Sequence, residues 1–377
     1  MHPKKVLTRR DFLRTGAVVG GTVLVGLPVA GSARWLAPVQ ASAPPVVDRL
    51  AIRVVVDNAH NVMVSTAKVG NVQVERVGWI FQPDYQKQLY SEFGLSLHLE
   101  SQRGSETRNF LLDYGFTSGA LLNNLEILTI DISSLDALIL SHGHVDHFGG
   151  LIPFLKRDRA KMRADLSIYV GGEDTFCARW LERPDGTRLS TGVLDRRELA
   201  GARVRVVMAD KPSVIEGQAF TTGPIPRTTF EKVLSTPMVE LGARDGLGCD
   251  ASHFSKEEQA GKVVVDQFWG EHATCFTVKD RGLVVISSCG HAGIVNSIRQ
   301  AQAVAGVQKV HAVVGGFHLG PAPEPYIAQV VQALKEIDPD YMIPMHCSGP
   351  GFTRMAEREM PAKLIVPYTG TRIVFGT

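Results

Sequence analysis

The most informative stretch of the sequence is Leu135-Asp-Ala-Leu-Ile-Leu-Ser-His-Gly-His-Val-Asp-His-Phe-Gly-Gly-Leu151. It begins with a short apolar run typical of a buried strand. Four metal-ligating side chains follow within six positions: His142, His144, Asp146 and His147. Side chains two apart in an extended segment point the same way, so His142 and His144 can converge on one ion. Asp146 and His147 can reach a second position nearby, so the stretch predicts a metal site at a strand end.

Strand-like and helix-like patterns alternate on both sides of this stretch, which indicates an α/β fold in one domain from residue 44 to residue 377. Apolar and β-branched runs predict strands at 50–56, 109–113, 135–140, 166–170, 204–208, 283–287, 310–314 and 341–344. Helical spacing of apolar residues predicts helices at 121–128, 151–156, 294–304 and 326–337. The segment from about 212 to 269 lacks this rhythm and contains several prolines and glycines. We expect it to form loops and hairpins that cover the site.

Three of the later predicted strands each lead to a histidine. Strand 283–287 precedes Cys289-Gly-His291, strand 310–314 precedes Gly315-Gly-Phe-His318, and strand 341–344 precedes Met345-His346-Cys347. His291, His318 and His346 are therefore further candidates for the metal site.

The first 43 residues resemble a twin-arginine export signal. Thr8-Arg-Arg-Asp-Phe-Leu-Arg14 places two adjacent arginines before an apolar, glycine-containing run from about Ala17 to Ala30. That run is shorter than the roughly 18 to 20 residues of a membrane-spanning helix. We expect a cleaved signal, with an uncleaved anchor as the alternative. The prediction is export by the twin-arginine translocase to the periplasm or another extracytoplasmic compartment, with no stable membrane span after cleavage.

Composition and charge argue against a nucleic-acid partner. Hydrophobic residues make up 44% of the chain, enough for a sizeable core, and charged residues make up 21%. The first 43 residues hold six basic residues and one acidic residue, so the formal net charge of +2 leaves the remainder slightly acidic. Nucleic-acid binding would need a basic stripe, and we expect a small-molecule substrate instead. The five cysteines are odd in number and irregularly spaced, which implies no disulfide framework and leaves at least one as a free thiol or a ligand.

The cluster of histidines and aspartate, with a strand before it and Gly149-Gly-Leu151 after it, resembles the signature of the metallo-β-lactamase superfamily. The resemblance implies an αβ/βα four-layer sandwich with the metal site at one edge. Asp113, in Leu111-Leu-Asp-Tyr-Gly115, matches the first motif of that superfamily, which usually reads Asp-Thr-Gly, so Tyr114 is a departure. The matching aspartate orients the ligands through hydrogen bonds, which fixes ring tautomers and raises ligand basicity.

Other motifs are similar to one branch of the superfamily. They are Val55-Val-Asp-Asn58, Ser118-Gly119 with Leu121-Leu-Asn-Asn124, Gly223-Pro-Ile-Pro-Arg227, Cys289-Gly-His-Ala-Gly-Ile-Val-Asn296, Gly315-Gly-Phe-His-Leu319 and His346-Cys-Ser-Gly349. The branch is named after a 7,8-dihydropterin-6-methyl-4-(β-D-ribofuranosyl)-aminobenzene-5′-phosphate synthase. Most members are called metal-dependent hydrolases, so the branch name does not settle the substrate.

The resemblance also implies the remaining ligands. In the superfamily a third histidine completes the first metal, an aspartate bridges the metals and a last histidine completes the second. Cys289 follows the strand at which the bridging aspartate commonly sits, so either His291 is the ligand here or Cys289 serves as a softer one. His346 best fits the final histidine, and His318 fits either a ligand or a general acid.

The predicted activity is hydrolysis of an ester, a phosphoester or a lactone by metal-activated water. We expect a divalent metal, with Zn as the first choice and Fe or Mn as alternatives, bound as one or two ions. Asp146 would hold metal and position the water, and His318 or a second water would protonate the leaving group. Arg227 is a candidate for binding an anionic substrate group. The alternatives are a transferase like the synthase and a non-catalytic metal-binding or sensor protein.

Overall fold

The computed structural model describes residues 44–78, 84, 86–234, 237–259 and 263–376. The predicted export signal at 1–43 lies outside these residues. Among the described helices, none combines the length and the apolar character needed to cross a membrane.

The larger sheet contains the strand at 135–140, which leads to His142 and His144. In the described part of the chain it has nine strands, in the order β11 (Arg205–Met208), β8 (Ser167–Val170), β7 (Leu135–Leu140), β6 (Glu106–Leu112), β5 (Ser96–Arg103), β2 (Arg49–Val56), β22 (Arg372–Gly376), β4 (Val72–Glu75) and β3 (Ala67–Val69). The strands from β11 to β6 are parallel, and each later pair is antiparallel. The carboxyl end of β7 therefore lies at the same edge as those of β6 and β8.

The second sheet carries the later histidines. Its path among the described residues runs β12 (Ser213–Ile215), β13 (Ala219–Thr221), β18 (Thr274–Val278), β19 (Gly282–Ser287), β20 (Val310–Gly315) and β21 (Tyr341–Pro344), and β1 (Val46–Val47) pairs with β18. β19, β20 and β21 are parallel neighbours, so their carboxyl ends also meet at one edge.

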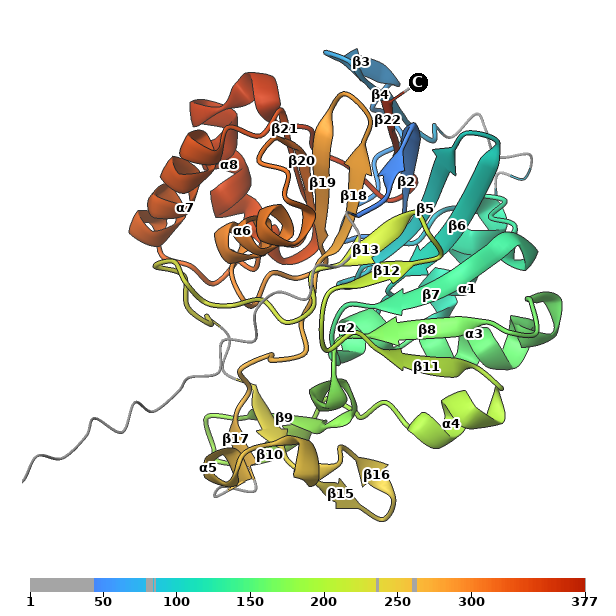
Figure 1. The fold of residues 1–377 in the computed structure, drawn as a ribbon, viewed down its shortest axis with the longest axis vertical. Coiled ribbons are helices and arrows are strands. Elements are labelled where there is room, and N and C mark those ends of the chain that lie inside the picture. The colour runs from blue at the N-terminus through green and yellow to red at the C-terminus, as the bar shows by residue number, and fades with distance from the viewer. Residues whose placement is uncertain (1–43, 79–83, 85, 235–236, 260–262, 377) are drawn as a thin grey trace, which may run out of the picture. The chain divides into compact units, whose positions relative to one another are not determined.

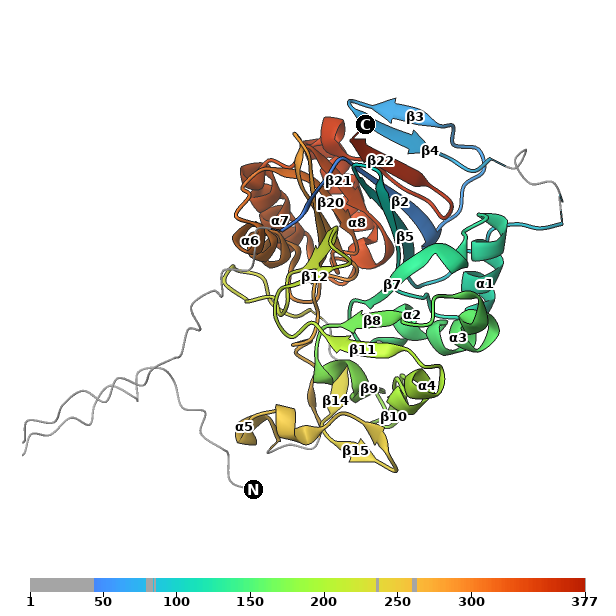
Figure 2. The ribbon, with the colours of Figure 1, turned by 45° about the vertical axis from the view of Figure 1, so that its right-hand side comes forward.

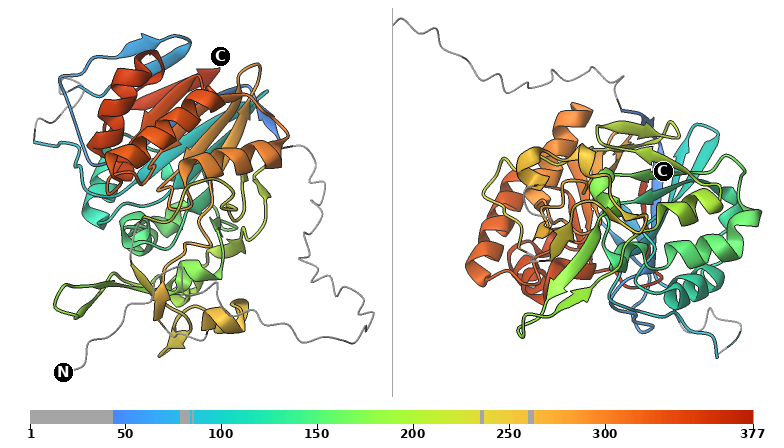
Figure 3. Two further views of the ribbon diagram at one scale, coloured as in Figure 1. Left: turned by 90° about the vertical axis from the view of Figure 1, so that its left-hand side faces the viewer. Right: turned by 90° about the horizontal axis from the view of Figure 1, so that it is seen from below.

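The two sheets face each other across an apolar core, and helices cover their outer faces (Figures 1 and 2). Strand alternation explains both cores, since Ala137 and Ile139 of β7 face the other sheet while Leu138 and Leu140 face the helices. The larger sheet packs against α1 (Ser118–Ile127), α3 (Leu151–Asp158) and α4 (Arg196–Gly201). The smaller sheet is covered by α6 (Ile294–Ala305), α7 (Glu324–Ile337) and α8 (Gly349–Glu359), as Figure 3 shows on the left. This is the predicted αβ/βα layering.

A small antiparallel sheet lies apart from the two large ones (Figure 3). Its four described strands are β10 (Arg188–Ser190), β9 (Ala178–Glu182), β14 (Met238–Glu240) and β17 (Val263–Val265). The hairpin of β15 (Ala243–Arg244) and β16 (Leu247–Gly248) and the short α5 (Lys256–Gln259) follow β14 in the chain. The segment predicted to be irregular, 212–269, thus contains β12 to β17.

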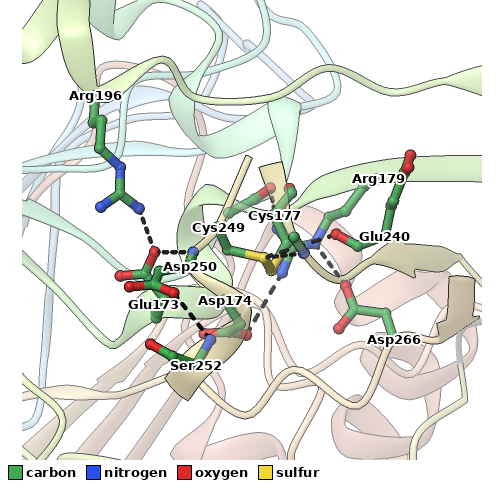
Figure 4. Close-up of a disulfide and its surroundings, with 12 residues drawn as sticks. Glu173, Asp174, Cys177, Arg179, Arg196, Glu240, Cys249, Asp250, Ser252 and Asp266 are labelled. Carbon is green, nitrogen blue, oxygen red and sulfur yellow. Dashed lines mark hydrogen bonds and ion pairs between the residues drawn. A yellow bond between two sulfur atoms is a disulfide. The ribbon is translucent and has the colours of Figure 1, made fainter. Parts of the chain in front are cut away.

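A disulfide joins Cys177, just before β9, to Cys249, 72 residues later (Figure 4). The irregular cysteine spacing did not reveal this bond, because it closes a long loop between two segments with no common motif. Cys275, Cys289 and Cys347 are free and buried, which confirms that at least one thiol is unpaired.

Candidate metal centre

The residues predicted to bind metal lie at the carboxyl ends of strands from both large sheets. β7 ends at Leu140 and leads to His142 and His144, and α2 (Val145–Phe148) then carries Asp146 and His147. The other three histidines follow the ends of the three parallel strands of the second sheet: His291 after β19, His318 after β20 and His346 after β21. Two facing sheets therefore bring these side chains together although as many as 204 positions separate them in the chain.

The first group of candidate ligands is His142, His144 and His291. One ring nitrogen from each lies within 4.8 Å of the others. Distances between their ring centroids are 4.8, 5.0 and 4.9 Å. Phe268 stacks on the His291 ring at 3.7 Å and meets the His144 ring edge-on at 4.9 Å. This aromatic contact restricts the orientation of two of the three rings.

The second group is Asp146, His147 and His346, whose candidate ligand atoms also lie within 4.8 Å of one another. The Asp146 carboxylate oxygen Oδ2 is 3.3 Å from His346 Nε2 and 3.7 Å from His147 Nε2. All three side chains are buried, so the group combines one carboxylate with two imidazoles away from bulk solvent.

The chemistry of both groups fits a divalent metal. Within the described residues, no side chain or backbone group forms a hydrogen bond with the buried Nε2 atoms of His142, His144 and His147. Burial lowers the pKa of His142 well below its ordinary value, with a further contribution from His147. Burial and the Arg179 guanidinium lower the pKa of His144 to about 3. Both rings are therefore neutral, which is the form of imidazole that binds metals.

The environment of His147 favours positive charge. Burial alone lowers the pKa of this ring, but the Asp146 and Asp113 carboxylates outweigh it and raise the pKa to about 9. Burial also raises the pKa of Asp146, and the imidazoles of His147 and His346 reverse that effect and hold it below its ordinary range. A metal cation bound between these groups would compensate the charge of the carboxylates as the proton on His147 does, because metal binding displaces the proton from a ligand.

Asp113 occupies the orienting position that the superfamily resemblance implies. Its carboxylate accepts hydrogen bonds from the Ser141 backbone N–H at 2.8 Å, the Ser141 hydroxyl at 2.8 Å and His147 Nδ1 at 2.7 Å. It is fully buried, and its φ of +58° is unusual for a residue with a side chain. With Nδ1 held by Asp113, the His147 Nε2 atom is directed at the metal position.

Replacing Asp113 with asparagine is expected to weaken metal binding about 10- to 100-fold, the usual effect of removing a hydrogen-bond partner of a ligand. An amide accepts only through its oxygen and cannot hold all three donors. The measurement is a competitive metal titration against a chromophoric chelator. Asp136→Asn is the matched control, because Asp136 also accepts a backbone N–H, from Asn109, but lies outside both ligand groups. Equal affinities for the two variants would contradict the role of Asp113.

Sulfur atoms lie beside the imidazole groups. Cys289 Sγ falls within 4.8 Å of candidate atoms of His142 and His147, and it also forms a group with His318 and Cys347. His318 and His346 both have left-handed backbone conformations, with φ of +47° and +51°. Strained residues of this kind cluster at functional sites. The sequence-based interpretation named Cys289 and His318 but missed Cys347, although it directly follows His346.

Comparisons with known proteins show similarity to proteins of the metallo-beta-lactamase superfamily. Residues 102–265 match the metallo-beta-lactamase superfamily. This match places a metallo-β-lactamase superfamily domain at residues 102–265. A 7,8-dihydropterin-6-methyl-4-(beta-D-ribofuranosyl)-aminobenzene-5′-phosphate synthase from Methanocaldococcus jannaschii is 27% identical over 294 residues, 76% of this chain and 91% of that protein. Tm1679, a solved metal-dependent hydrolase of the beta-lactamase superfamily, has the same fold, with a TM-score of 0.60 and 22% identity over 86% of this chain and 98% of that one.

Other buried residues, which the sequence did not reveal, contact the turn that carries His142 and His144. Arg179 is fully buried and donates from Nε to Asp266 at 2.6 Å and from Nη1 to the Gly143 carbonyl at 3.1 Å. Asp266 Oδ2 is in turn 3.8 Å from His144 Nε2. Gly143 is required here, because a Cβ would lie 2.3 Å from the Thr175 carbonyl oxygen. Arg179, from β9 of the small sheet, thus stabilises the turn between His142 and His144.

A buried carboxylate holds the turn that carries His291. Glu271 accepts the backbone N–H groups of Gly290, His291 and Ala292 at 2.8, 3.0 and 2.6 Å. No motif pointed to Glu271, because its partners lie about 20 residues away and are backbone atoms.

Arg227 lies beside the candidate ligand cluster rather than in it. Its guanidinium sits 4.5 Å from the centre of the Trp269 ring and donates to the Gln267 carbonyl oxygen. Gln267 directly precedes Phe268, which stacks on His291. The structure therefore ties Arg227 to the segment that borders the centre, and its predicted substrate contact stays a prediction.

Proposed function

We propose that this protein is a metal-dependent hydrolase that acts on an ester, phosphoester or lactone. One observation carries the proposal: six candidate ligands, from the ends of β7, β19 and β21 and from α2, converge as two groups of three. The buried Nε2 atoms of His142, His144 and His147 have no hydrogen-bond partner among the described residues. The groups are His142, His144 and His291, and Asp146, His147 and His346. Three protein ligands per ion leave coordination positions open for water and substrate, which a purely structural site does not need.

Zn is the metal we favour for this centre, with Fe or Mn as alternatives, because imidazole dominates the donor set. When bound, such an ion would supply a water ligand whose pKa is lowered toward about 7 and would polarise the substrate oxygen. Asp146 would contribute the anionic ligand and help to position that water. Phe268 and Phe93 pack against the rings of His291 and His346 and keep those ligands in place.

Two residues near the centre are proposed to act on the substrate. His318, partly exposed at the edge of the ligand cluster, or a second water would protonate the leaving group. Arg227 would bind an anionic substituent, since a guanidinium pairs with phosphate or carboxylate through two hydrogen bonds.

Replacing Arg227 with alanine is expected to raise KM for an anionic substrate at least about tenfold, because a hydrogen bond to a charged group contributes about 1.5–3 kcal/mol. The value of kcat should change less, since Arg227 lies outside the two ligand groups. Steady-state kinetics on charged and neutral substrates of the same class test this. Arg188→Ala, an exposed arginine of β10, is the control. An unchanged KM in the Arg227 variant would remove it from the substrate site.

We also propose that the protein works outside the cytoplasm. The twin-arginine pattern at 8–14 supports export. The Cys177–Cys249 disulfide supports it independently, because such bonds persist in oxidising compartments.

The 27% identity to the synthase favours one alternative, a transferase that joins a dihydropterin to an aminobenzene ribose phosphate. Export argues against it, because pterin intermediates and phosphorylated precursors are cytosolic. A non-catalytic metal-binding or sensor protein is the third alternative.

The deciding experiment combines metal analysis of the purified protein with a substrate panel of phosphodiesters, phosphomonoesters, lactones and β-lactams. We expect at least one equivalent of transition metal, and hydrolysis that a chelator abolishes and added metal restores. Product formation from the pterin and aminobenzene substrates, without hydrolysis, would establish the transferase instead. Metal binding with no turnover of any substrate would favour the sensor, and absence of bound metal would reject the hydrolase and the sensor.

A further inference from the structure

A cluster of two thiols and an imidazole lies next to the imidazole groups. Cys289 Sγ is 3.2 Å from Cys347 Sγ and 3.5 Å from His318 Nδ1, and the three candidate ligand atoms lie within 4.8 Å of one another. Cys289 and Cys347 are 2% and 6% exposed. We propose that Cys289, His318 and Cys347 form a separate binding position for a thiophilic metal ion such as Zn²⁺.

Three neighbouring strands of the second sheet fix the positions of Cys289, His318 and Cys347. The three residues follow β19, β20 and β21, which are hydrogen-bonded parallel neighbours, so the sheet fixes their relative placement. Gly316 makes room for the Cys347 sulfur atom and the backbone of Cys289. A Cβ at this position would lie 2.7 Å from Cys347 Sγ and 3.0 Å from the Cys289 Cα. A larger residue at position 316 would therefore displace Cys347 Sγ or the backbone at Cys289.

The donor set distinguishes this position from the other two. Thiolates are soft ligands that select ions such as Zn²⁺ and Cu⁺, whereas a carboxylate with imidazoles also accepts harder ions such as Mn²⁺. Two cysteines and one histidine leave a fourth tetrahedral position open. Cys289 Sγ also faces His142 and His147, so it lies between the sulfur position and the imidazole groups.

The proposal gives His318 the ligand role of the two roles predicted for it, because its Nδ1 lies 3.5 Å from Cys289 Sγ. A second water, the other proton donor named for the proposed hydrolysis, would then protonate the leaving group. Cys275 provides a contrast within the same chain. It is equally buried, but it lies in β18 and belongs to none of the candidate metal groups among the described residues.

Titration of the metal-free full chain with Co²⁺ alone tests the proposal without reference to activity. Thiolate coordination produces an intense near-ultraviolet charge-transfer absorption that imidazole and carboxylate ligands do not. We expect this band in the wild type and in Cys275→Ala. In Cys347→Ala the band should fall by at least half, and binding should drop by one equivalent. In His318→Gln the Co²⁺ dissociation constant of the thiol position should rise about tenfold or more, because one of three ligands is lost.

The variant His144→Ala separates this proposal from the proposed function. It removes a ligand of the first imidazole group, so hydrolysis should be lost while the charge-transfer band remains. A band that disappears in His144→Ala would place the sulfur in the imidazole centre and overturn the separate position. No band in the wild type, or a band of unchanged size in Cys347→Ala, would also overturn it. Circular dichroism shows whether each variant is folded, and the His318 variant tests the position should Cys347→Ala not fold.

Discussion

Replacing Asp146 with alanine is expected to remove one equivalent of bound metal and to lower kcat for hydrolysis by more than about 100-fold. Losing even a hydrogen-bond partner of a ligand costs about 10- to 100-fold in metal affinity or activity, and Asp146 is itself a candidate ligand. Its Oδ2 atom lies within 3.7 Å of the Nε2 atoms of both His147 and His346. The remaining two imidazoles would face each other without the anion that balances the charge of an ion.

The measurements are metal content by elemental analysis and kcat on the best substrate of the panel. Asp158→Ala is the matched control, because the Asp158 side chain is also buried and ion-paired, with Arg157 and Lys161, but lies at the end of α3. The control should keep its metal and its activity. An Asp146 variant with full metal content and undiminished kcat would show that the second ligand group is not the catalytic one.

Much of this centre could be predicted because its residues follow strands with clear apolar patterns. β7 and β21 have the predicted bounds, and the predicted strands 283–287 and 310–314 correspond to β19 and β20 within one residue at each end. A residue just after a buried parallel strand lies at the carboxyl edge of the sheet, so its position follows from the strand. That rule places His291 and His346 beside the cluster formed by His142 to His147.

Other parts of the centre depend on contacts that leave no local pattern. Strand β5 (Ser96–Arg103) alternates apolar and polar residues irregularly, and its place in the sheet comes from its antiparallel partners β2 and β6. Phe268 belongs to the segment without regular pattern, yet it stacks on His291. The Arg179–Asp266 pair joins residues 87 positions apart. Long-range packing of this kind becomes visible only in three dimensions.

Removing the disulfide by the double replacement Cys177→Ser and Cys249→Ser is expected to lower the free energy of unfolding by about 2–4 kcal/mol. The bond closes a loop with a sequence separation of 72 residues, and opening a long loop releases chain entropy in the unfolded state. The bond also anchors the start of β9, where Arg179 donates to Asp266 (Figure 4). Arg179 also donates to the Gly143 carbonyl oxygen. Denaturant unfolding of the metal-free protein under non-reducing conditions measures the difference.

Reduction supplies the control for this experiment. Wild-type protein in a reductant should unfold at the same denaturant concentration as the double variant, while the variant itself should not respond to the reductant. Loss of the bond should also affect the metal centre, because Arg179 of β9 and Asp266, which directly follows β17, hold the turn between His142 and His144. We therefore expect the double variant to bind metal more weakly than the wild type. Equal stability with and without the bond would mean that the packing of the small sheet, and not the covalent link, holds this turn in place.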